Sequence, residues 1–278
     1  MATLSQDTCV HDKPAYRLYD RNGRGITYAE MLGHLGDVTV VLFGELHDNP
    51  IVHWLQLEVT KDLFAVRKRS LVLGAEMFEA DDQIILDEYL AGTIGDDHLK
   101  KEAKIWDNYE TDYRPLVEFA KVHGLRFIAT NVPRRYASLA ARKGLKALTG
   151  LPDEAKRWIA PLPIRLNLKS PTYRDLLDLS VAHGIRAKNF LAAQAIKDAT
   201  MAHFILRNLK AGDLFMHFHG EYHARKYGGI CWYLRRASKD LRVATITAVT
   251  ANTLEFADDY RGLADYTIVI PHTMTRTC

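Results

Sequence analysis

Two short stretches with the pattern Gly-Glu-x-His carry the side chains of this chain that are best suited to chemistry. They are residues 44–47 and 220–223, and each follows a run of apolar residues. A carboxylate and an imidazole can bind a first-row metal ion, or can act as an acid and a base. The glycine in front of them lets the backbone turn sharply and approach another group closely. One such turn is most often ordinary hydrogen-bonded structure, but two of them favour a functional site.

The two turns supply four candidate site residues, and a third apolar run supplies a fifth. The five are Glu45, His47, Glu221, His223 and Glu76. As a metal site, the two histidines and the three glutamates would be ligands, and Glu221 could also orient another ligand. In a metal-dependent hydrolase, Glu45 or Glu76 would act as the general base on a metal-bound water.

A second polar stripe lies further along the chain, where Gln194 and Asp198 are spaced to share one face of a helix. One interpretation is a helix with a polar side in solvent. The other is that this face leans over the candidate site, where Asp198 either pairs with Arg134 or orients a histidine.

Tyrosine is the third residue type that matters, with thirteen in the chain. A tyrosine phenolate can ligate ferric haem. On composition alone this indication is weak, because most tyrosines are packed with a hydrogen-bonded hydroxyl. No Cys-x-x-Cys-His sequence is present, so covalently attached haem is not expected.

Six apolar runs predict the strands that must position these residues. They are residues 38–43, 71–74, 125–132, 214–218, 243–249 and 266–270. Helical patterns lie between them, at residues 52–66, 83–90 and 113–123. Strands that alternate with helices and are apolar throughout predict an α/β fold, in which helices flank a large, mainly parallel β-sheet in three α/β/α layers. Ligands bind at the carboxyl ends of such strands, where both turns and Glu76 are expected.

The strand signal disappears between residues 134 and 208, where helical patterns and four prolines occur. We therefore predict a smaller all-helical subdomain at 134–208, inserted into a sheet domain made of residues 1–133 and 209–278.

Composition narrows the class of protein. The chain has 278 residues and a net charge of +3, which gives no sign of nucleic-acid binding. Its three cysteines include no Cys-x-x-Cys pair, which argues against a thiolate zinc site and a disulfide framework. No apolar run is long enough to predict a transmembrane helix, and the first residues do not resemble a signal peptide.

The order of motifs along the chain resembles that of a known family. The motifs are FGELHDNP, LGAEMFEADDQ, WDNYETDYRPLVEFAKVHG, ATNVPRRY, AAQAIKDATMA and HGEYH. Together they resemble the ChaN-like haem-binding family, in a superfamily that also holds the Tiki proteases and erythromycin-esterase-like proteins. The resemblance runs from about residue 38 to residue 229.

The resemblance implies a haem-binding protein of bacterial haem–iron uptake. Haem would be held by a tyrosine at a homodimer interface, with a histidine and a lysine of the other subunit on the propionates. Tyr173, followed by His183 and Lys188, is the first choice for this set, and Tyr109 and Tyr113 are the alternatives.

The resemblance also implies a lipoprotein of the bacterial cell envelope, with an outer-membrane haem receptor as a partner. No lipoprotein signal is visible in this chain, so a cytoplasmic location is the alternative. The Tiki proteins imply a rival function, a metal-dependent hydrolase that uses the two Gly-Glu-x-His turns and Glu76. Haem is thus the expected cofactor and a divalent metal ion a second one, and whether the chain is an enzyme stays open.

Overall fold

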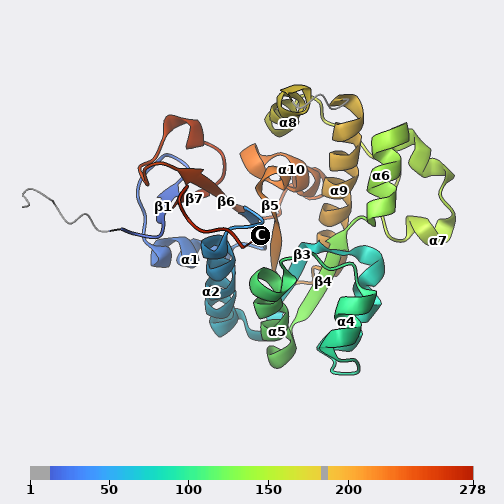
Figure 1. The fold of residues 1–278 in the computed structure, drawn as a ribbon, viewed down its shortest axis with the longest axis horizontal. Coiled ribbons are helices and arrows are strands. Elements are labelled where there is room, and N and C mark those ends of the chain that lie inside the picture. Colours follow the sequence, from blue (N-terminus) through green and yellow to red (C-terminus); the bar gives the residue numbers. More distant parts are fainter. Residues whose placement is uncertain (1–12, 183–186, 278) are drawn as a thin grey trace, which may run out of the picture.

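The computed structural model describes residues 13–182 and 187–277 and contains one seven-stranded sheet with helices on both faces (Figure 1). The strands are β1 (Arg17–Asp20), β2 (Val40–Glu45), β3 (Leu71–Glu79), β4 (Arg126–Asn131), β5 (Leu214–Gly220), β6 (Val243–Ala251) and β7 (Tyr266–Pro271). Their order in the sheet is β1-β7-β6-β2-β5-β3-β4, with β1 antiparallel to β7 and the other pairs parallel. No helix in the described ranges is long and apolar enough to cross a membrane.

Ten α-helices connect and cover the strands in the described part of the chain. They are α1 (Tyr28–Asp37), α2 (Pro50–Arg67), α3 (Gln83–Leu90), α4 (Asp96–Glu102), α5 (Arg114–His123), α6 (Arg134–Lys143), α7 (Asp153–Lys156), α8 (Pro171–Ala182), α9 (Ala187–Asn208) and α10 (Gly229–Ala237). A π-helical turn, η3 (Tyr109–Tyr113), precedes α5, and a 3-10 turn, η5 (Glu221–His223), follows β5.

The predicted α/β/α layering is confirmed, and all six predicted strands are present with small differences at their ends. The largest difference is in β3, which extends to Glu79 through an irregularity in its pairing with β4. Glu76 therefore lies within the strand rather than beyond it. The strand that the sequence did not predict, β1, has only four residues and pairs at the edge of the sheet.

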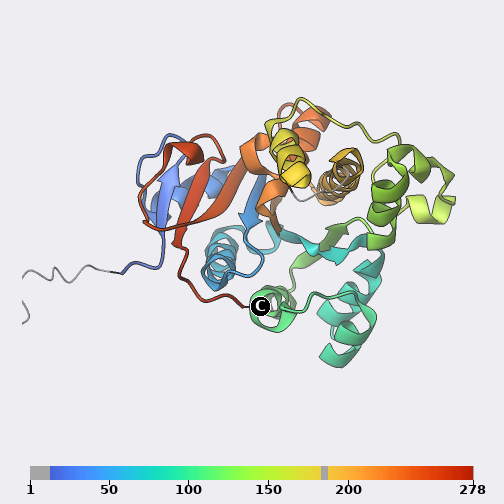
Figure 2. The same ribbon diagram turned by 45° about the horizontal axis from the view of Figure 1, so that its top comes forward.

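Alternate side chains of the central strands pack into two different hydrophobic cores, one on each face of the sheet. Val41 and Phe43 of β2 pack with α1, α2, α3 and α5 on one face. Val40 and Leu42 pack with α9 and α10 on the other face. Because both faces are covered, the strand is apolar from Val40 to Phe43, as expected for a buried parallel strand. Figure 2 shows the two helical layers on either side of the sheet.

The segment between β4 and β5 contains α6, α7, α8 and α9. The second half of α9 packs on the sheet through Met201, Phe204 and Ile205. Ala192 and Ile196, nearer its start, join a separate cluster with α6. Helix α9 thus packs both on the sheet and on α6, and the subdomain boundaries at residues 134 and 208 stay a prediction.

The chain reverses its direction across the sheet between the neighbouring strands β2 and β5. After β2 it enters α2 on one face, and after β5 it enters α10 on the other. Such a reversal opens a crevice at the carboxyl ends of the two strands, where open α/β sheets bind their ligands. Glu45 pairs in register with Gly220 at this point, so the two Gly-Glu-x-His turns lie side by side.

Candidate functional site

The two glycines of the paired turns allow close approach, each in a different way. A side-chain carbon on Gly44 would lie 3.0 Å from backbone atoms of Glu221 and Ile246. A side-chain carbon on Gly220 would lie 2.7 Å from His47 Nε2 and 3.6 Å from Glu76 Oε2. His47 and Glu76 therefore line the same small space over Gly220, although they come from different strands.

Glu45 is buried and its carboxylate is held by three neighbours. Its Oε1 accepts hydrogen bonds from the Tyr113 hydroxyl at 2.6 Å and from His47 Nδ1 at 2.9 Å. Its Oε2 accepts one from Gln56 Nε2 at 2.6 Å. Burial alone would raise the pKa of Glu45, but the hydrogen bond from His47 and the nearby imidazole of His53 outweigh it and lower the pKa to about 2. The carboxylate is therefore charged throughout the ordinary pH range.

His47 is oriented by the groups around it, while its Nε2 faces the space over Gly220. Its ring lies edge-on to Trp106, with 4.9 Å between ring centroids. Its main-chain oxygen accepts hydrogen bonds from Asn108 Nδ2 at 2.7 Å and from His53 Nε2 at 3.1 Å. Burial would lower the pKa of His47, but Glu45 outweighs that effect and raises it. The side chain is 47% exposed, so solvent reaches part of the ring.

A second carboxylate–imidazole pair faces the first across Gly220. Glu76 accepts hydrogen bonds from His223 Nε2 at 3.0 Å and from the main-chain nitrogen of Gly220 at 2.9 Å. On the other side of the ring, His223 Nδ1 donates to Asp198 Oδ1 at 2.5 Å. Asp198 Oδ2 in turn accepts from the Tyr173 hydroxyl at 2.8 Å. A buried chain of four side chains thus runs from the sheet edge into the helical layer.

The charges of Glu76 and His223 in this series of side chains stabilise one another. Burial would lower the pKa of His223, but the negative charges of Glu76 and Asp198 raise it to about 9. Burial would likewise raise the pKa of Glu76, and the charges of His223 and Lys197 hold it well below its usual value. Lys197 Nζ is 3.4 Å from Glu76. The pair is therefore an imidazolium and a carboxylate at neutral pH.

The supporting residues divide between the site and its surroundings. Gln194 reaches the site, since its side-chain amide nitrogen lies 2.9 Å from His223 Nδ1. Asp198 contacts the histidine and not Arg134, whose side chain is exposed and has its Nε 3.9 Å from Glu79. Glu221 turns away and binds Arg225, with the closer contact at 3.0 Å.

The predicted metal site is not supported by this geometry. Within the described ranges, no group of three or more His, Cys, Asp or Glu side chains is arranged to hold a metal ion. The physical reason is that the candidate ligands satisfy each other in pairs. His47 Nδ1 is committed to Glu45 and both nitrogens of His223 are committed to carboxylates, while Glu221 pairs with Arg225.

The three tyrosines that were candidates for haem are all buried. Tyr113 donates to Glu45 and Tyr173 to Asp198, while the Tyr109 hydroxyl has no hydrogen-bond partner within the described part of the chain. Burial is the largest cause that raises the pKa of each hydroxyl. As arranged here, none of them presents a phenolate to a ligand. His183 and the side chain of Lys188 lie outside the described residues.

Several residues of the site were not predicted from the sequence. Gln56 and His53 bind the first turn from α2, and Asn108 binds it from the segment before η3. A signal did exist for α2, because His53, Gln56 and Thr60 form a polar stripe on its buried face. Lys197 lies next to Asp198 on α9 and carried no separate signal.

Comparison with models of known protein families shows to which family this chain belongs. The model of the family described as haem-binding uptake, Tiki superfamily, ChaN matches residues 31–234, well over half of the sequence. The chain belongs to that family. The match covers β2 to β5 and most of α10. It therefore includes both turns and all four residues of the hydrogen-bonded series Glu76, His223, Asp198 and Tyr173.

One solved structure shares the fold over nearly its whole length, and two others match more weakly. The ChaN protein of Campylobacter jejuni, described with cofacial heme binding, has a TM-score of 0.68 and 16% identity, over 92% of this chain and 96% of that one. An erythromycin esterase mutant, EreC H289N, matches with a TM-score of 0.49 and 12% identity, over 93% of this chain and 83% of that one. A succinoglycan biosynthesis protein matches with a TM-score of 0.48 and 13% identity, over 80% and 68%. No curated protein sequence matches the chain.

Proposed function

We propose that this protein binds haem and acts in bacterial haem–iron uptake. The observation that carries the proposal is its membership of the ChaN family across residues 31–234. The fold it shares with the Campylobacter jejuni ChaN protein is consistent with it. By the same family relationship we propose a homodimer that forms around the ligand, a location in the bacterial cell envelope and an outer-membrane haem receptor as a partner.

Tyr173 is the proposed iron ligand, and the structure makes the condition for this role clear. Its hydroxyl is buried and donates to Asp198 at 2.8 Å, so it does not fit an iron ligand in the arrangement described here. Ligation by Tyr173 requires that this hydrogen bond break and that the hydroxyl become accessible. Tyr109 and Tyr113 are buried as well, and the Tyr113 hydroxyl would also have to leave Glu45.

A hemin titration of the purified protein tests this proposal, with absorption spectra and size-exclusion chromatography on the same samples. We expect saturable uptake, the high-spin spectrum of a tyrosine-ligated ferric haem, and a shift from monomer to dimer. Tyr173→Phe should abolish that spectrum, whereas Tyr222→Phe, a partly buried tyrosine outside the candidate set, should leave it intact.

Two results would contradict the proposal. Absence of saturable hemin uptake would remove haem binding itself. Unchanged spectra in the Phe variants of Tyr173, Tyr109 and Tyr113 would remove the tyrosine ligand but leave haem binding in place. In that case His47 would be the next residue to replace, because its side chain is half-exposed and histidine also ligates haem iron.

The geometry at Gly220 favours a second function, which is acid–base hydrolysis without a metal ion. The specific observation is that two carboxylate–imidazole pairs, Glu45–His47 and Glu76–His223, meet over one glycine. His47 has a half-exposed ring, an Nε2 that faces the space over Gly220 and a carboxylate behind Nδ1, which is the arrangement of a general base with an orienting group. His223, whose two ring nitrogens both bind carboxylates, adds a fixed positive charge beside the space over Gly220. The glutamates then orient and charge the imidazoles instead of binding a metal.

Hydrolysis of a panel of p-nitrophenyl esters by the EDTA-treated protein tests this second function. We expect turnover that survives the chelator and falls by about 10²- to 10⁴-fold in His47→Ala, the range for loss of a general base. His98→Ala, which removes an exposed histidine of α4, is the matched control. Turnover that the chelator abolishes, or that His47→Ala leaves unchanged, would contradict it.

A further inference from the structure

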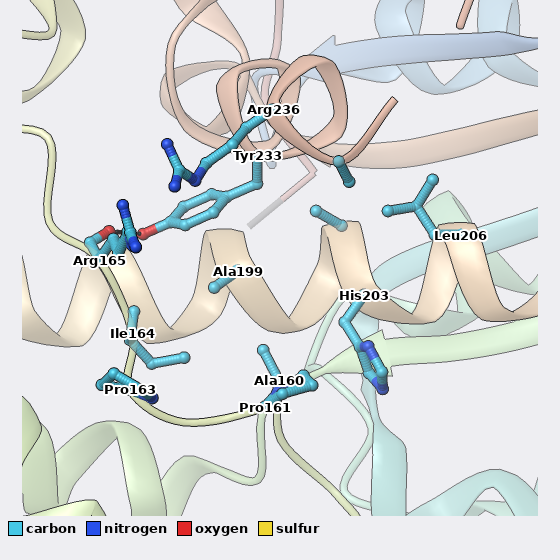
Figure 3. Close-up of a pocket in the computed structure, with 12 residues that line it drawn as sticks. Ala160, Pro161, Pro163, Ile164, Arg165, Ala199, His203, Leu206, Tyr233 and Arg236 are labelled. Atoms are coloured by element: carbon cyan, nitrogen blue, oxygen red, sulfur yellow. Dashed lines mark hydrogen bonds between the residues drawn. The ribbon is translucent and has the colours of Figure 1, made fainter. Parts of the chain in front are cut away.

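A cavity of about 370 Å³ lies between α9, α10 and the loop at residues 160–165. Its lining residues are Ala160, Pro161, Pro163, Ile164, Arg165, Ala199, Ala202, His203, Leu206, Tyr233, Arg236 and Ala237 (Figure 3). None of them belongs to the two Gly-Glu-x-His turns or to the hydrogen-bonded series Glu76, His223, Asp198 and Tyr173. The volume is within the range of pockets that hold small molecules.

The hollow exists because α9 carries small residues where it faces α10 and the loop. Ala199 and Ala202, three positions apart on one helical face, are buried and form the floor. Ile164 and Leu206 add apolar walls. The body of a ligand that fits this space must therefore be apolar.

Two arginines give the cavity its charge. Arg165 comes from the loop and Arg236 from α10, and Figure 3 shows both guanidinium groups on the same side of the Tyr233 ring. Within the part of the chain that the structure describes, neither arginine forms an ion pair with a carboxylate, whereas the neighbouring Arg157 pairs with Glu154 at 3.1 Å. Both side chains are exposed at the rim of the hollow, so an anion can reach the two positive charges from solvent.

The walls are held in place from both sides. The main-chain nitrogen of Ala160 donates to Thr200 Oγ1 of α9 at 3.2 Å. The Tyr233 hydroxyl of α10 donates to the main-chain oxygen of Arg165 at 2.5 Å. The loop is thus anchored near each of its ends, at Ala160 and at Arg165, and the backbone of Arg165 is fixed by the second of these hydrogen bonds. A site with fixed walls loses little free energy to ordering when a ligand binds.

We propose that this cavity is a binding site for a small apolar carboxylate. The carboxylate lies between Arg165 and Arg236, whose planar guanidinium groups match its two oxygens. The apolar chain of the ligand packs against Ala199, Ala202 and Ile164. This site goes beyond haem binding, since it uses neither the three candidate tyrosines nor the sheet edge.

Isothermal titration of the full-length protein with octanoate and with 1-octanol tests the proposal, since the two share an apolar chain and differ in charge. We expect octanoate to bind at least tenfold more tightly than octanol. Arg165→Gln and Arg236→Gln should each weaken octanoate by about three- to fivefold, the range for one exposed charge pair, and leave octanol unchanged. The double variant should bind the two ligands about equally.

Arg235→Gln is the matched control, because it removes a charge from the same helix outside the cavity. Arg235 lies over the Tyr227 ring at 5.1 Å and does not line the hollow. Its variant should keep the full preference for octanoate. Absence of octanoate binding, equal affinity for octanol in the wild type, or an undiminished preference in the double variant would each overturn the proposal.

A hemin titration of the same double variant separates this site from haem binding. We expect hemin affinity to equal that of the wild type. A loss of hemin affinity would show that the two arginines belong to the haem site and would overturn the assignment of a separate ligand. Should the wild type bind octanoate but not hemin, the cavity stands and the proposed haem function fails.

Discussion

His223 Nε2 lies 3.0 Å from Glu76 Oε1. This contact joins the second Gly-Glu-x-His turn to strand β3, which lies two positions from β2 and the first turn in the sheet. Both side chains are almost completely buried. A buried imidazolium is tolerable only beside negative charge, and Asp198 on the far side of the ring adds to it. The contact therefore makes the stability of the fold depend on the protonation of one histidine.

The first prediction concerns that dependence. The pKa of His223 is raised from 6.5 to about 9 in the folded protein, mainly because Glu76 and Asp198 outweigh the effect of burial. A raised pKa in the folded state gives stability that is complete below pH 6.5 and is lost as pH rises through 9. We expect the free energy of unfolding in urea to fall by about 3 kcal/mol across that window, from the usual 1.36 kcal/mol for each pKa unit.

Two buried glutamates provide the comparison. Glu76→Gln should lower the pKa of His223 and flatten this part of the stability curve. Glu221→Gln should keep the fall, because Glu221 binds Arg225 instead. A wild-type curve that is flat between pH 6.5 and 9 would show that His223 is not held as an imidazolium.

The second prediction compares two buried tyrosines four residues apart. Tyr113→Phe removes a donor to the buried carboxylate of Glu45 and should destabilise the protein by about 1.5–3 kcal/mol. Tyr109→Phe removes a buried hydroxyl that has no hydrogen-bond partner in the described ranges, so it should be neutral or stabilising. Urea unfolding at pH 7 measures both, and equal losses in the two variants would contradict the assignment of these hydrogen bonds.

The third prediction separates the two glycines of the site. Gly44→Ala places a carbon 3.0 Å from backbone atoms on both sides, which cannot easily move, and should cost about 1–3 kcal/mol. Gly220→Ala places one 2.7 Å from the ring of His47, a half-exposed side chain that can swing aside. We expect a smaller loss of stability there, but a clear change in the NMR signals of His47. A larger loss from Gly220→Ala than from Gly44→Ala would refute this reasoning.

Most of the fold could be predicted from the sequence, because a buried parallel strand must be apolar throughout. The apolar run that contains Val40 and Phe43 is typical of a strand buried on both faces. The edge strand β1 was not predicted, because four residues of which only Leu18 and Tyr19 are buried carry too little pattern. The edge location of Glu45 and His47 followed from the same strand logic, and the register Glu45–Gly220 then brought the two turns together.

The partners within the site could not be predicted, because they depend on rotamers and on helix placement. The sequence shows that Glu221 and His223 are neighbours, but not that one faces Arg225 and the other Glu76. It also cannot show that Tyr173 points inward to Asp198, which needs the packing of α8 against α9. A metal site looked reasonable from residue types alone, but the geometry of the described residues does not support one, because the candidate ligands pair with one another.

The last prediction concerns the proton on His47, whose Nδ1 lies 2.9 Å from Glu45. Burial would lower the pKa of this imidazole, but the hydrogen bond and charge of Glu45 raise it instead. Glu45→Gln should therefore lower the pKa of His47 measured by NMR titration of its ring proton. Glu79→Gln, which changes a buried glutamate that faces Lys104 at 3.3 Å, should leave it unchanged. Because a general base must be neutral, any ester hydrolysis by the wild type should increase with pH as His47 loses its proton, and in Glu45→Gln this rise should move to lower pH. A rise that stays in place while the titration of His47 moves would show that another group is the base.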